Sequence, residues 1–271
     1  MENQLIKEIV EEIHNKGFYI FKSLLSDSEI KDFYSEVKSR KPTVLNEFQK
    51  EAWGYGSFLE DSCAKPILKH ENLKRILNEY IQDEGEFNHI LVNSKAPLVG
   101  GNVEWHQELA NIDTFAPGSD ISNVSSFLQV YISLSGENRT NGGLSIVPYS
   151  HHEGFLKHID ILWNHNSHKR EILSDELISV VNKYGLIYPE LNPGDALIFG
   201  HLLIHSSGRN DTTLPRVSVV SQYRSRNIKE RWDDNLWKKE TKYRSDFVIE
   251  KLKDTIDIKL SNKNIYGEFK C

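Results

Sequence analysis

Residues 193–207 read Pro-Gly-Asp-Ala-Leu-Ile-Phe-Gly-His-Leu-Leu-Ile-His-Ser-Ser and join a sharp turn to an apolar run that ends at a histidine. Proline followed by glycine fits the two central positions of a type II turn, and the side chain of Asp195 can accept hydrogen bonds from nearby backbone. The run Ala196 to Ile204 predicts a buried strand with His205 at its end, where the turn Ser206-Ser207-Gly208 begins. This stretch therefore predicts a β-rich core with a candidate functional side chain at a strand end.

Short β-branched and aromatic runs recur before and after this stretch. The segments between them carry turn chemistry such as Asn141-Gly142-Gly143. The runs cover Phe87 to Asn93, Phe127 to Leu134, Leu144 to Val147 and Val217 to Tyr223. Together they predict an antiparallel sheet sandwich or barrel. The segment from Phe155 to Tyr184 is polar and partly helical in pattern, and it interrupts the strands as a loop over a barrel mouth would.

The N-terminal third has helical spacing of its apolar residues instead. Gly17 can end a first helix, and a short strand, Phe18 to Phe21, follows it. Ser26 precedes Glu29 by three residues, which is the capping-box pattern at the start of a second helix. The apolar stripes that predict three helices are Leu5, Ile9 and Ile13, then Ile30, Phe33, Tyr34 and Val37, and then Leu73, Ile76, Leu77 and Tyr80.

Length favours one domain. The chain has 271 residues, and double-layered β folds of this size commonly form one unit with a substantial core. We expect a single domain over residues 1–271, with mainly helical support in 1–85, a β core in 86–226 that contains the insertion 155–184, and a C-terminal extension in 227–271. The extension is expected to pack on the outside of the sheets, because its apolar residues are spaced as in ordinary amphipathic segments.

Charge and cysteine content narrow the class of protein. Lys and Arg total 33 against 39 Asp and Glu, and the net charge of -6 is spread along the chain. This gives no sign of the concentrated basic face that binds nucleic acid or an anionic membrane. Cys63 and Cys271 are too few for a disulfide framework, and no apolar run approaches the roughly 20 residues that span a bilayer. We therefore expect a cytoplasmic monomer or homodimer whose partner is a small molecule.

Candidate metal ligands lie in Glu104-Trp105-His106-Gln107-Glu108. On a strand, the side chains of His106 and Glu108 leave the same face and can hold one ion. His205 can complete the set of ligands. Two imidazoles and a carboxylate on one side of an octahedral ferrous ion leave three positions open, enough for a bidentate 2-oxo acid and dioxygen. For the pair alone, the alternative is a strand histidine beside a surface acid, because such spacing arises by chance among 11 histidines.

Arg216 stands eleven residues after His205, at the start of the next β-run. A hairpin return would place it beside the strand that carries His205. Its guanidinium can clasp the far carboxylate of 2-oxoglutarate through two parallel hydrogen bonds, which a lysine cannot do. A salt bridge at a strand edge is the alternative.

Four motifs in chain order resemble the phytanoyl-CoA dioxygenase-like branch of the iron and 2-oxoglutarate oxygenases, over about Phe18 to Arg224. They are Trp105 to Glu108, Asn141-Gly142-Gly143-Leu144 running to Val147-Pro148 and Ser150-His151, Pro193 to Phe199, and His205-x-Ser207-x-x-Asn210 running to Arg216. The resemblance implies an α+β, mainly β fold: a double-stranded β-helix, or cupin-like jelly roll, with helices from the N-terminal third on one side. It also implies iron at the mouth of the barrel, with Fe(II), 2-oxoglutarate and O2 as cofactor and co-substrates.

Glu108 departs from the family pattern, which usually has aspartate there. The longer arm moves the carboxylate by about one methylene, which a small rotamer or backbone change can absorb. We keep the metal assignment of His106, Glu108 and His205. A carboxylate at this position also argues against the halogenating relatives, which need a small residue to leave room for chloride.

Three further residues are candidates for binding 2-oxoglutarate. Ser207 matches a family hydroxyl that assists the carboxylate, with an ordinary turn serine as the alternative. Lys95 resembles a family lysine that can reach the co-substrate, with a solvated lysine as the alternative. Gln129 shares a strand face with Tyr131 and can bind the 2-oxo acid or the substrate, although core packing with a satisfied amide is the favoured interpretation.

The remaining loop histidines suggest no second metal site. His151, His152, His165 and His168 lie in polar loops, where we expect them to be solvated.

The sequence thus predicts an enzyme, a non-haem Fe(II)- and 2-oxoglutarate-dependent dioxygenase that oxidises an unactivated C–H bond and releases succinate and CO2. Hydroxylation is the favoured outcome, with desaturation, epimerisation or ring closure as alternatives that the metal ligands alone do not decide. A small polar substrate is favoured because the loop from Ala110 to Asn123 offers polar groups and no basic cluster suits the phosphates of CoA. Two alternatives remain. One is a cupin-type isomerase or dioxygenase that does not use 2-oxoglutarate and has no use for Arg216, and the other is a non-catalytic jelly-roll binding protein.

Overall fold

The structure, a computed structural model, describes residues 3–39, 44–45, 50–53, 67, 69–81, 85–98, 102–108, 116–120, 122–160 and 170–231. Within them the α-helices are α1 (Asn3–Lys16), α2 (Asp27–Ser39), α4 (Glu71–Tyr80), α6 (Ser174–Tyr184) and α7 (Arg226–Arg231). The strands are β1 (Phe18–Phe21), β2 (Val44–Leu45), β3 (Lys50–Trp53), β4 (Glu86–Lys95), β5 (Val103–His106), β6 (Phe127–Ser133), β7 (Leu144–Ile146), β8 (His158–Asp160), β9 (Arg170–Ile172), β10 (Ala196–Gly200), β11 (His205–Ser207) and β12 (Arg216–Arg224).

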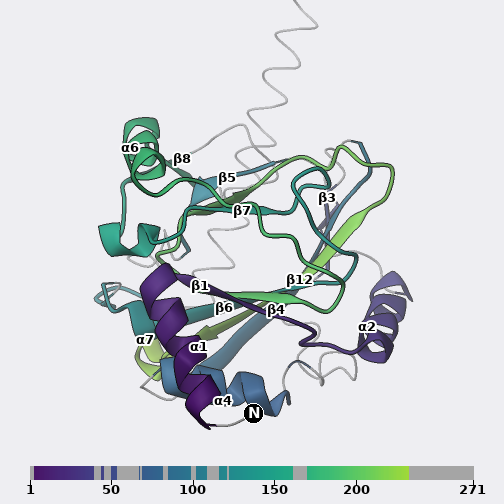
Figure 1. Ribbon diagram of the computed structural model, residues 1–271, viewed down its shortest axis with the longest axis horizontal. Helices are drawn as coiled ribbons and strands as arrows, with labels where there is room; N and C mark the ends of the chain where they lie inside the picture. Colours follow the sequence, from purple (N-terminus) through teal and green to yellow (C-terminus); the bar gives the residue numbers. More distant parts are fainter. Residues whose placement is uncertain are drawn as a thin grey trace, which may run out of the picture.

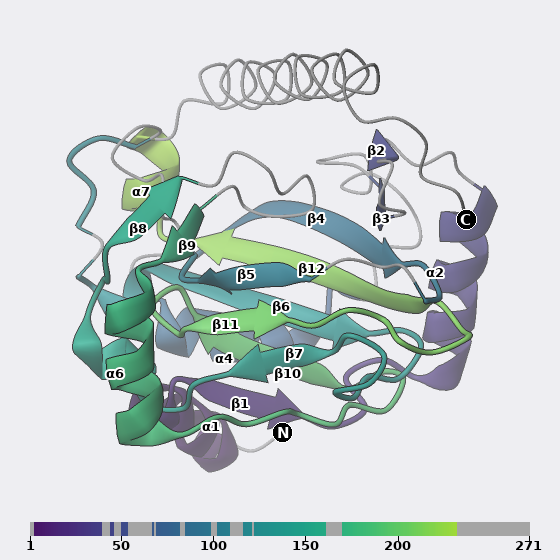
Figure 2. The ribbon, with the colours of Figure 1, turned by 90° about the horizontal axis from the view of Figure 1, so that it is seen from above.

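Two facing sheets form the core of the molecule. The large sheet is seven-stranded, in the order β1-β10-β6-β12-β4-β3-β2, and the small sheet is three-stranded, in the order β5-β11-β7. Their neighbouring strands pair antiparallel. Figure 2 shows the small sheet lying over one face of the large sheet. This two-layered antiparallel arrangement with flanking helices is the mainly β jelly roll that the sequence predicted.

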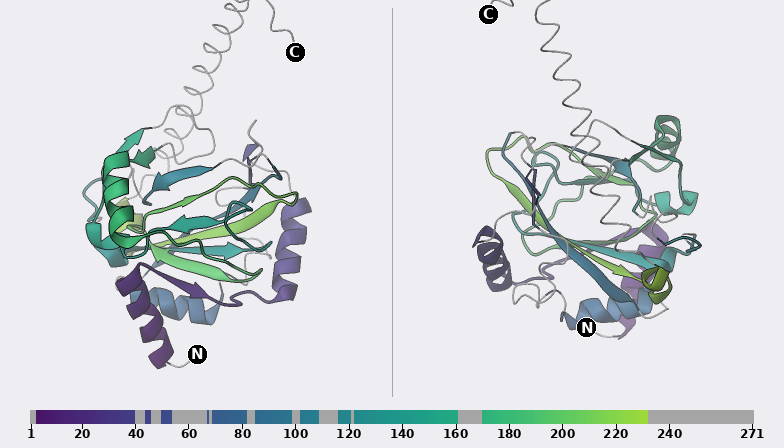
Figure 3. Two further views of the ribbon diagram at one scale, coloured as in Figure 1. Left: turned by 45° about the horizontal axis from the view of Figure 1, so that its top comes forward. Right: turned by 180° about the vertical axis from the view of Figure 1, so that it is seen from behind.

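Helices α1 and α4 cover the other face of the large sheet (Figures 1 and 3). Their apolar stripes pack in one core with outward-facing strand residues such as Val130, Ile198 and Val219. A second cluster, which includes Tyr131 and Val220, lies between the two sheets. Alternation along each strand therefore decides which side chains reach the interior: odd positions of β6 and even positions of β12 face the small sheet.

The predicted helix boundaries are confirmed. Gly17 has a φ of 91° and its amide donates to the carbonyl of Ile13 over 2.8 Å, which ends α1. At the start of α2, the amide of Ser26 donates to Glu29 Oε2 over 2.8 Å, and the amide of Glu29 donates to Ser26 Oγ over 3.4 Å. These two bonds are the capping box that the spacing predicted.

The turn before β10 is also confirmed. The amide of Asp195 donates to the carbonyl of Asn192 over 3.0 Å, and Gly194 has a φ of 87°, as a type II turn requires. The carboxylate of Asp195 accepts from the amides of Asn192 and Ser23, each over 2.9 Å, and from Lys22 Nζ over 2.8 Å. Asp195 thereby ties the end of β1 to the start of β10.

The prediction of one strand from Ala196 to Ile204 was wrong. β10 ends at Gly200, and the amide of Leu203 donates back to the carbonyl of Gly200 over 3.3 Å. β11 begins only at His205. The chain crosses here from the large sheet to the small one. Residues 202–204 remain buried throughout the turn, so an unbroken apolar run gave no signal of it.

The expected place of Arg216 beside the strand of His205 was wrong for the same reason. β12 pairs with β4 and β6, whereas β11 pairs with β5 and β7. Arg216 therefore faces the strand of His205 from the opposite sheet.

Parts of the expected insertion and extension are described, and the expected packing of the extension on the outside of the sheets stays a prediction. The insertion contains the hairpin of β8 and β9 and the helix α6. The extension begins with α7, and residues 232–271 lie outside the described residues. No helix in the described part of the chain has the length and apolar character needed to cross a membrane.

Candidate active site

The three predicted metal ligands converge at the end of the small sheet. His106 is the last residue of β5 and lies opposite His205, the first residue of β11. Glu108 follows two residues after His106, where its amide donates to the carbonyl of His201 over 2.9 Å. Glu108 Oε1 lies 3.3 Å from His205 Nε2 and 3.7 Å from His106 Nε2. One potential ligand atom from each residue lies within 4.8 Å of the other two.

The backbone fixes which nitrogen of each imidazole faces this cluster. His106 Nδ1 lies 2.7 Å from the carbonyl oxygen of Glu104, and His205 Nδ1 lies 2.9 Å from that of Leu203. Because a carbonyl can only accept, each Nδ1 carries a hydrogen, so in the neutral form of each imidazole Nε2 keeps its lone pair. Burial and the neighbouring His205 lower the pKa of His106, which favours the neutral imidazole. Two neutral imidazoles and a carboxylate are a donor set that fits ferrous iron.

A pair of amides adjoins the cluster on the large sheet. Gln222 Nε2 donates to Gln129 Oε1 over 2.8 Å and to Glu108 Oε2 over 3.4 Å. Gln129 and Gln222 are opposite each other in the register of β6 and β12, and both are buried. The predicted residue Gln129 thus lies on the interior face of β6, and Gln222 lies between it and Glu108. The side-chain oxygen of Gln129 accepts its hydrogen bond from Gln222.

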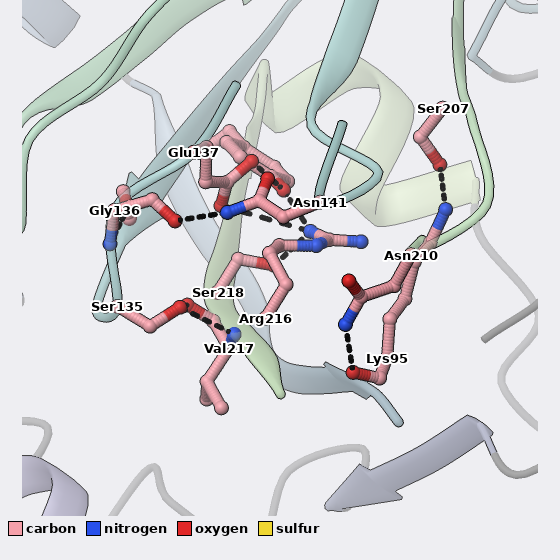
Figure 4. A network of polar contacts seen from close by, with 12 residues as sticks. Lys95, Ser135, Gly136, Glu137, Asn141, Ser207, Asn210, Arg216, Val217 and Ser218 are labelled. Carbon is pink, nitrogen blue, oxygen red and sulfur yellow. Dashed lines mark hydrogen bonds and ion pairs between the residues drawn. The ribbon is translucent and has the colours of Figure 1, made fainter. Parts of the chain in front are cut away.

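Arg216 enters the interior from the first position of β12. Its Nη1 donates to Tyr131 Oη. The same Nη1 donates to Ser218 Oγ over 2.9 Å and lies 3.6 Å from Glu137 Oε1 (Figure 4). The ion pair with Glu137 is the salt bridge that the alternative interpretation of Arg216 expected, but it lies buried in the interior. Arg216 Nε is buried and has no hydrogen-bond partner among the described residues. An unpartnered guanidinium nitrogen in the interior fits a carboxylate of 2-oxoglutarate.

Glu137 was missed in the sequence. Its Oε2 accepts from Tyr131 Oη over 2.7 Å. Burial raises the pKa of Glu137, while the charges and hydrogen bonds of Arg216 and Tyr131 oppose that rise. Glu137 lies in the turn region after β6, where no periodicity marks a residue as buried. Ser218 was missed too, although its position two residues after Arg216 places both on one strand face.

Lys95 and Ser207 meet beside this network. Lys95 is the residue of β4 opposite Arg216, and only 1% of it is exposed, so it is not a solvated lysine. Its Nζ donates to Ser207 Oγ over 2.8 Å and to the carbonyl of Gly208 (Figure 4). Asn210 Nδ2 donates to the carbonyl of Lys95 over 3.1 Å. Since Ser207 is a buried residue of β11, this contact joins the small sheet to the large one.

The expectation of solvated loop histidines was wrong for His151. It is buried, and its Nε2 lies 2.8 Å from the carbonyl of His14. The exposed His152 places Nε2 3.0 Å from the carbonyl of Asn15. The last turn of a helix leaves carbonyls without partners, and these two imidazoles satisfy them at the end of α1. A polar loop sequence does not reveal that the loop folds back on a helix end.

Other predicted segments fall outside the described residues. His165 and His168 are among them. So are residues 110–115 and 121 of the loop whose polar groups favoured a small polar substrate, and Cys63 and Cys271.

Comparisons with known proteins agree with this architecture. Residues 1–218 match the family Phytanoyl-CoA dioxygenase (PhyH). The chain is 23% identical over 239 residues to an ectoine dioxygenase of Bordetella bronchiseptica, which covers 80% of this chain and 74% of that protein. Three solved structures share the fold. EctD from S. alaskensis has a TM-score of 0.62 at 14% identity, with 83% of this chain and 76% of that chain covered.

The epimerase SnoN, solved with Fe3+ and alpha ketoglutarate, has a TM-score of 0.66 at 13% identity, with 83% and 85% covered. EvdO2 from Micromonospora carbonacea var. aurantiaca has a TM-score of 0.62 at 17% identity, with 83% and 91% covered. These likenesses confirm the jelly roll, and the family match confirms the resemblance that the motifs carried. The chain belongs to the phytanoyl-CoA dioxygenase family and is a non-haem dioxygenase that depends on iron and 2-oxoglutarate.

Proposed function

We propose that this enzyme hydroxylates an unactivated C–H bond of a small polar metabolite. His106, Glu108 and His205 hold the iron, and Arg216 anchors 2-oxoglutarate. The observation that carries this proposal is the convergence of three buried ligand atoms in the same interior as a guanidinium whose Nε has no partner in the described part of the chain. Bound Fe(II) supplies the oxidising chemistry, in which O2 and 2-oxoglutarate give succinate and CO2 as the substrate is oxidised.

The protein positions the reactants and excludes water. The two Nε2 atoms and the Glu108 carboxylate hold the metal at one end of the interior. Arg216 Nε donates to the far carboxylate of 2-oxoglutarate, while its Nη1 stays with Tyr131 and Ser218. A bound dicarboxylate is thereby fixed at its far end, which leaves its keto acid end free to reach the metal.

Glu137 and Lys95 support the anchor. Glu137 accepts from Tyr131 and attracts Arg216, so it fixes which edge of the guanidinium turns to the co-substrate. Lys95 and Ser207 add two polar groups on the side where β4 and β11 meet. Arg216, Lys95 and Ser207 thereby offer the dicarboxylate several donors in a site of low dielectric, where such hydrogen bonds are strongest.

The buried amides of Gln129 and Gln222 support a substrate with polar groups, because they place hydrogen-bonding atoms next to the metal ligands. The buried contacts of Arg216 argue against a cupin-type enzyme that does not use 2-oxoglutarate, because such an enzyme has no need for a buried cationic anchor. They also argue against a binding protein that has lost the reaction.

The test is succinate release from the purified protein with Fe(II), 2-oxoglutarate and ascorbate across a panel of small polar metabolites. We expect one or more metabolites to stimulate consumption of 2-oxoglutarate and to gain one oxygen atom by mass. His205→Ala should abolish metal binding and turnover. Arg216→Ala should keep metal binding and lose 2-oxoglutarate binding, whereas the exposed control Arg209→Ala should behave as wild type. Iron-independent turnover, or full 2-oxoglutarate affinity in Arg216→Ala, contradicts the proposal.

A further inference from the structure

The side chain at position 108 has one more rotatable bond than the aspartate usual in the family. A glutamate that moves freely can present either carboxylate oxygen, or both, to a cation. In the structure, the two oxygens of Glu108 have different surroundings. Oε1 faces the imidazoles of His106 and His205, and Oε2 accepts from Gln222 Nε2.

The donor to Oε2 is itself held in place. Gln222 is buried on the interior face of β12, and the same Nε2 donates over 2.8 Å to Gln129 Oε1. Gln129 is the direct cross-strand neighbour of Gln222, so the two amides are set by the pairing of β6 and β12. The contact to Glu108 therefore connects a residue that follows the small sheet to two central strands of the large sheet.

We propose that Gln222 is a positioning residue for Glu108: it holds Oε2, so that Oε1 alone is directed at the metal position, and Gln129 holds Gln222. This inference rests on the proposed function, since it concerns the same metal site. It explains how a longer carboxylate can serve where a shorter one is usual, because the extra rotatable bond is restrained by a donor from the opposite sheet. Removing a residue that hydrogen-bonds to a metal ligand in this way commonly lowers metal affinity by about 10–100-fold.

The test is a double-mutant cycle with Co(II), an oxygen-stable substitute for Fe(II), followed by its visible absorption. Gln222→Leu removes the donor and keeps the volume and burial of the side chain close to those of glutamine. We expect Co(II) affinity to fall by about 10–100-fold and the absorption bands to change, because no amide then holds Oε2 of Glu108. Ser221→Ala is the matched control: it lies next to Gln222 on β12, is buried, and faces the other side of the sheet.

The second half of the cycle uses Glu108→Asp, whose carboxylate is too short to reach Gln222 and sits in the usual family position. In that background Gln222→Leu should have little further effect on Co(II) affinity, which gives a large coupling between positions 108 and 222. Equal losses in the wild-type and Glu108→Asp backgrounds would indicate a general packing defect and overturn the positioning role. Wild-type affinity and spectrum in Gln222→Leu would overturn it as well.

Failure of the metal and co-substrate site that the proposed function assigns gives a different result, because the wild-type protein would then bind neither Co(II) nor 2-oxoglutarate. If Gln222→Leu does not fold, judged by circular dichroism, Gln129→Leu tests the same claim by removing the acceptor that holds Gln222. We expect a smaller loss of Co(II) affinity in this variant and the same direction of spectral change. An unchanged spectrum and affinity in folded Gln129→Leu would refute the part assigned to Gln129.

Discussion

The carboxylate of Glu137 accepts a hydrogen bond from Tyr131 and lies 3.6 Å from Arg216 in the interior between the sheets. Burial of a carboxylate is costly unless a cation and donors surround it, and these two residues supply both. The three side chains therefore depend on one another. The conformation of Arg216, the proposed anchor of 2-oxoglutarate, is thus set by a residue that does not itself need to touch the co-substrate.

Removing Glu137 should weaken both the fold and the anchor. In Glu137→Ala, Arg216 keeps its charge in the interior and loses its carboxylate, a change that typically costs about 3–5 kcal/mol. We expect unfolding by urea to occur at lower concentration and 2-oxoglutarate to bind more weakly. Glu137→Gln keeps an oxygen that can accept from Tyr131 and should retain more of the stability. If Glu137→Ala matches wild type in both urea unfolding and 2-oxoglutarate titration, Glu137 does not support the anchor.

Single-residue predictions succeeded where a motif combines spacing with unusual chemistry. The spacing of His106 and Glu108 and the position of His205 at a turn located the cluster of ligand atoms, whereas the role of Arg216 as the anchor of 2-oxoglutarate stays a prediction. Glu137 could not be found this way, because its burial depends on how the chain after β6 turns back against Leu191. No pattern in neighbouring residues records such a contact.

At the scale of elements, the turn that starts β10 joins two segments that lie far apart in the sequence. Asp195 accepts hydrogen bonds from the backbone of Ser23 and Asn192 and from Lys22, so it connects the segment after β1 to β10. Burial alone would raise the pKa of Asp195, but the hydrogen bonds from Lys22, Ser23 and Asn192 outweigh it and lower the pKa below 3.8.

Asp195→Asn should destabilise the fold in a manner that depends on pH. Hydrogen bonds to a charged group contribute about 1.5–3 kcal/mol, and we expect a loss of this order at neutral pH. A carboxyl group with a lowered pKa stabilises the fold above its unfolded pKa, here 3.8, and this stabilisation is lost as pH falls through the lower folded pKa. Urea unfolding of wild type and variant should therefore converge in acid. The exposed control Asp211→Asn should unfold in urea as the wild type does at neutral pH. For Asp195→Asn, a difference that is constant with pH would contradict the assignment.

Element boundaries followed from the sequence best where a cap or turn has its own chemistry, as at Gly17, at the capping box of Ser26 and Glu29, and at the turn of Asp195. The break between β10 and β11 did not, because Leu202, Leu203 and Ile204 are buried in the turn as deeply as they would be in a strand. An apolar run indicates burial, and burial alone does not distinguish a straight strand from one that crosses between layers.

At the scale of the whole molecule, the fold class and the order of the motifs could be predicted, whereas the assignment of strands to sheets could not. Hydrophobic alternation indicates which face of a strand is buried and says nothing about which sheet the strand joins. This is why Arg216 was expected beside His205 and instead faces it from the other layer. The solved structures that share this fold include the epimerase SnoN, so the architecture alone does not decide the reaction.

Ligands that bind only the folded state should raise its melting temperature. A free ligand at 100 times its dissociation constant adds about 2.7 kcal/mol to stability. We expect Co(II) to raise the melting temperature of the metal-free protein, and 2-oxoglutarate to raise it further. Removing the metal with a chelator should reverse both shifts. In Arg216→Ala the shift with Co(II) should remain and the further shift with 2-oxoglutarate should disappear; retention of both would show that the co-substrate is held elsewhere.

The division of the site between two layers has a mechanical consequence. His106 and His205 belong to the small sheet, whereas Arg216 and Tyr131 belong to the large one. A dicarboxylic acid held at one end by the arginine and at the other by the metal would connect the two sheets, and its length is fixed by its carbon chain. The distance between the two sheets is set by apolar residues such as Leu197 and Phe199, and it would then determine which length of dicarboxylate fits. Packing changes that move the sheets apart should therefore weaken binding of the co-substrate even though no polar contact has been altered.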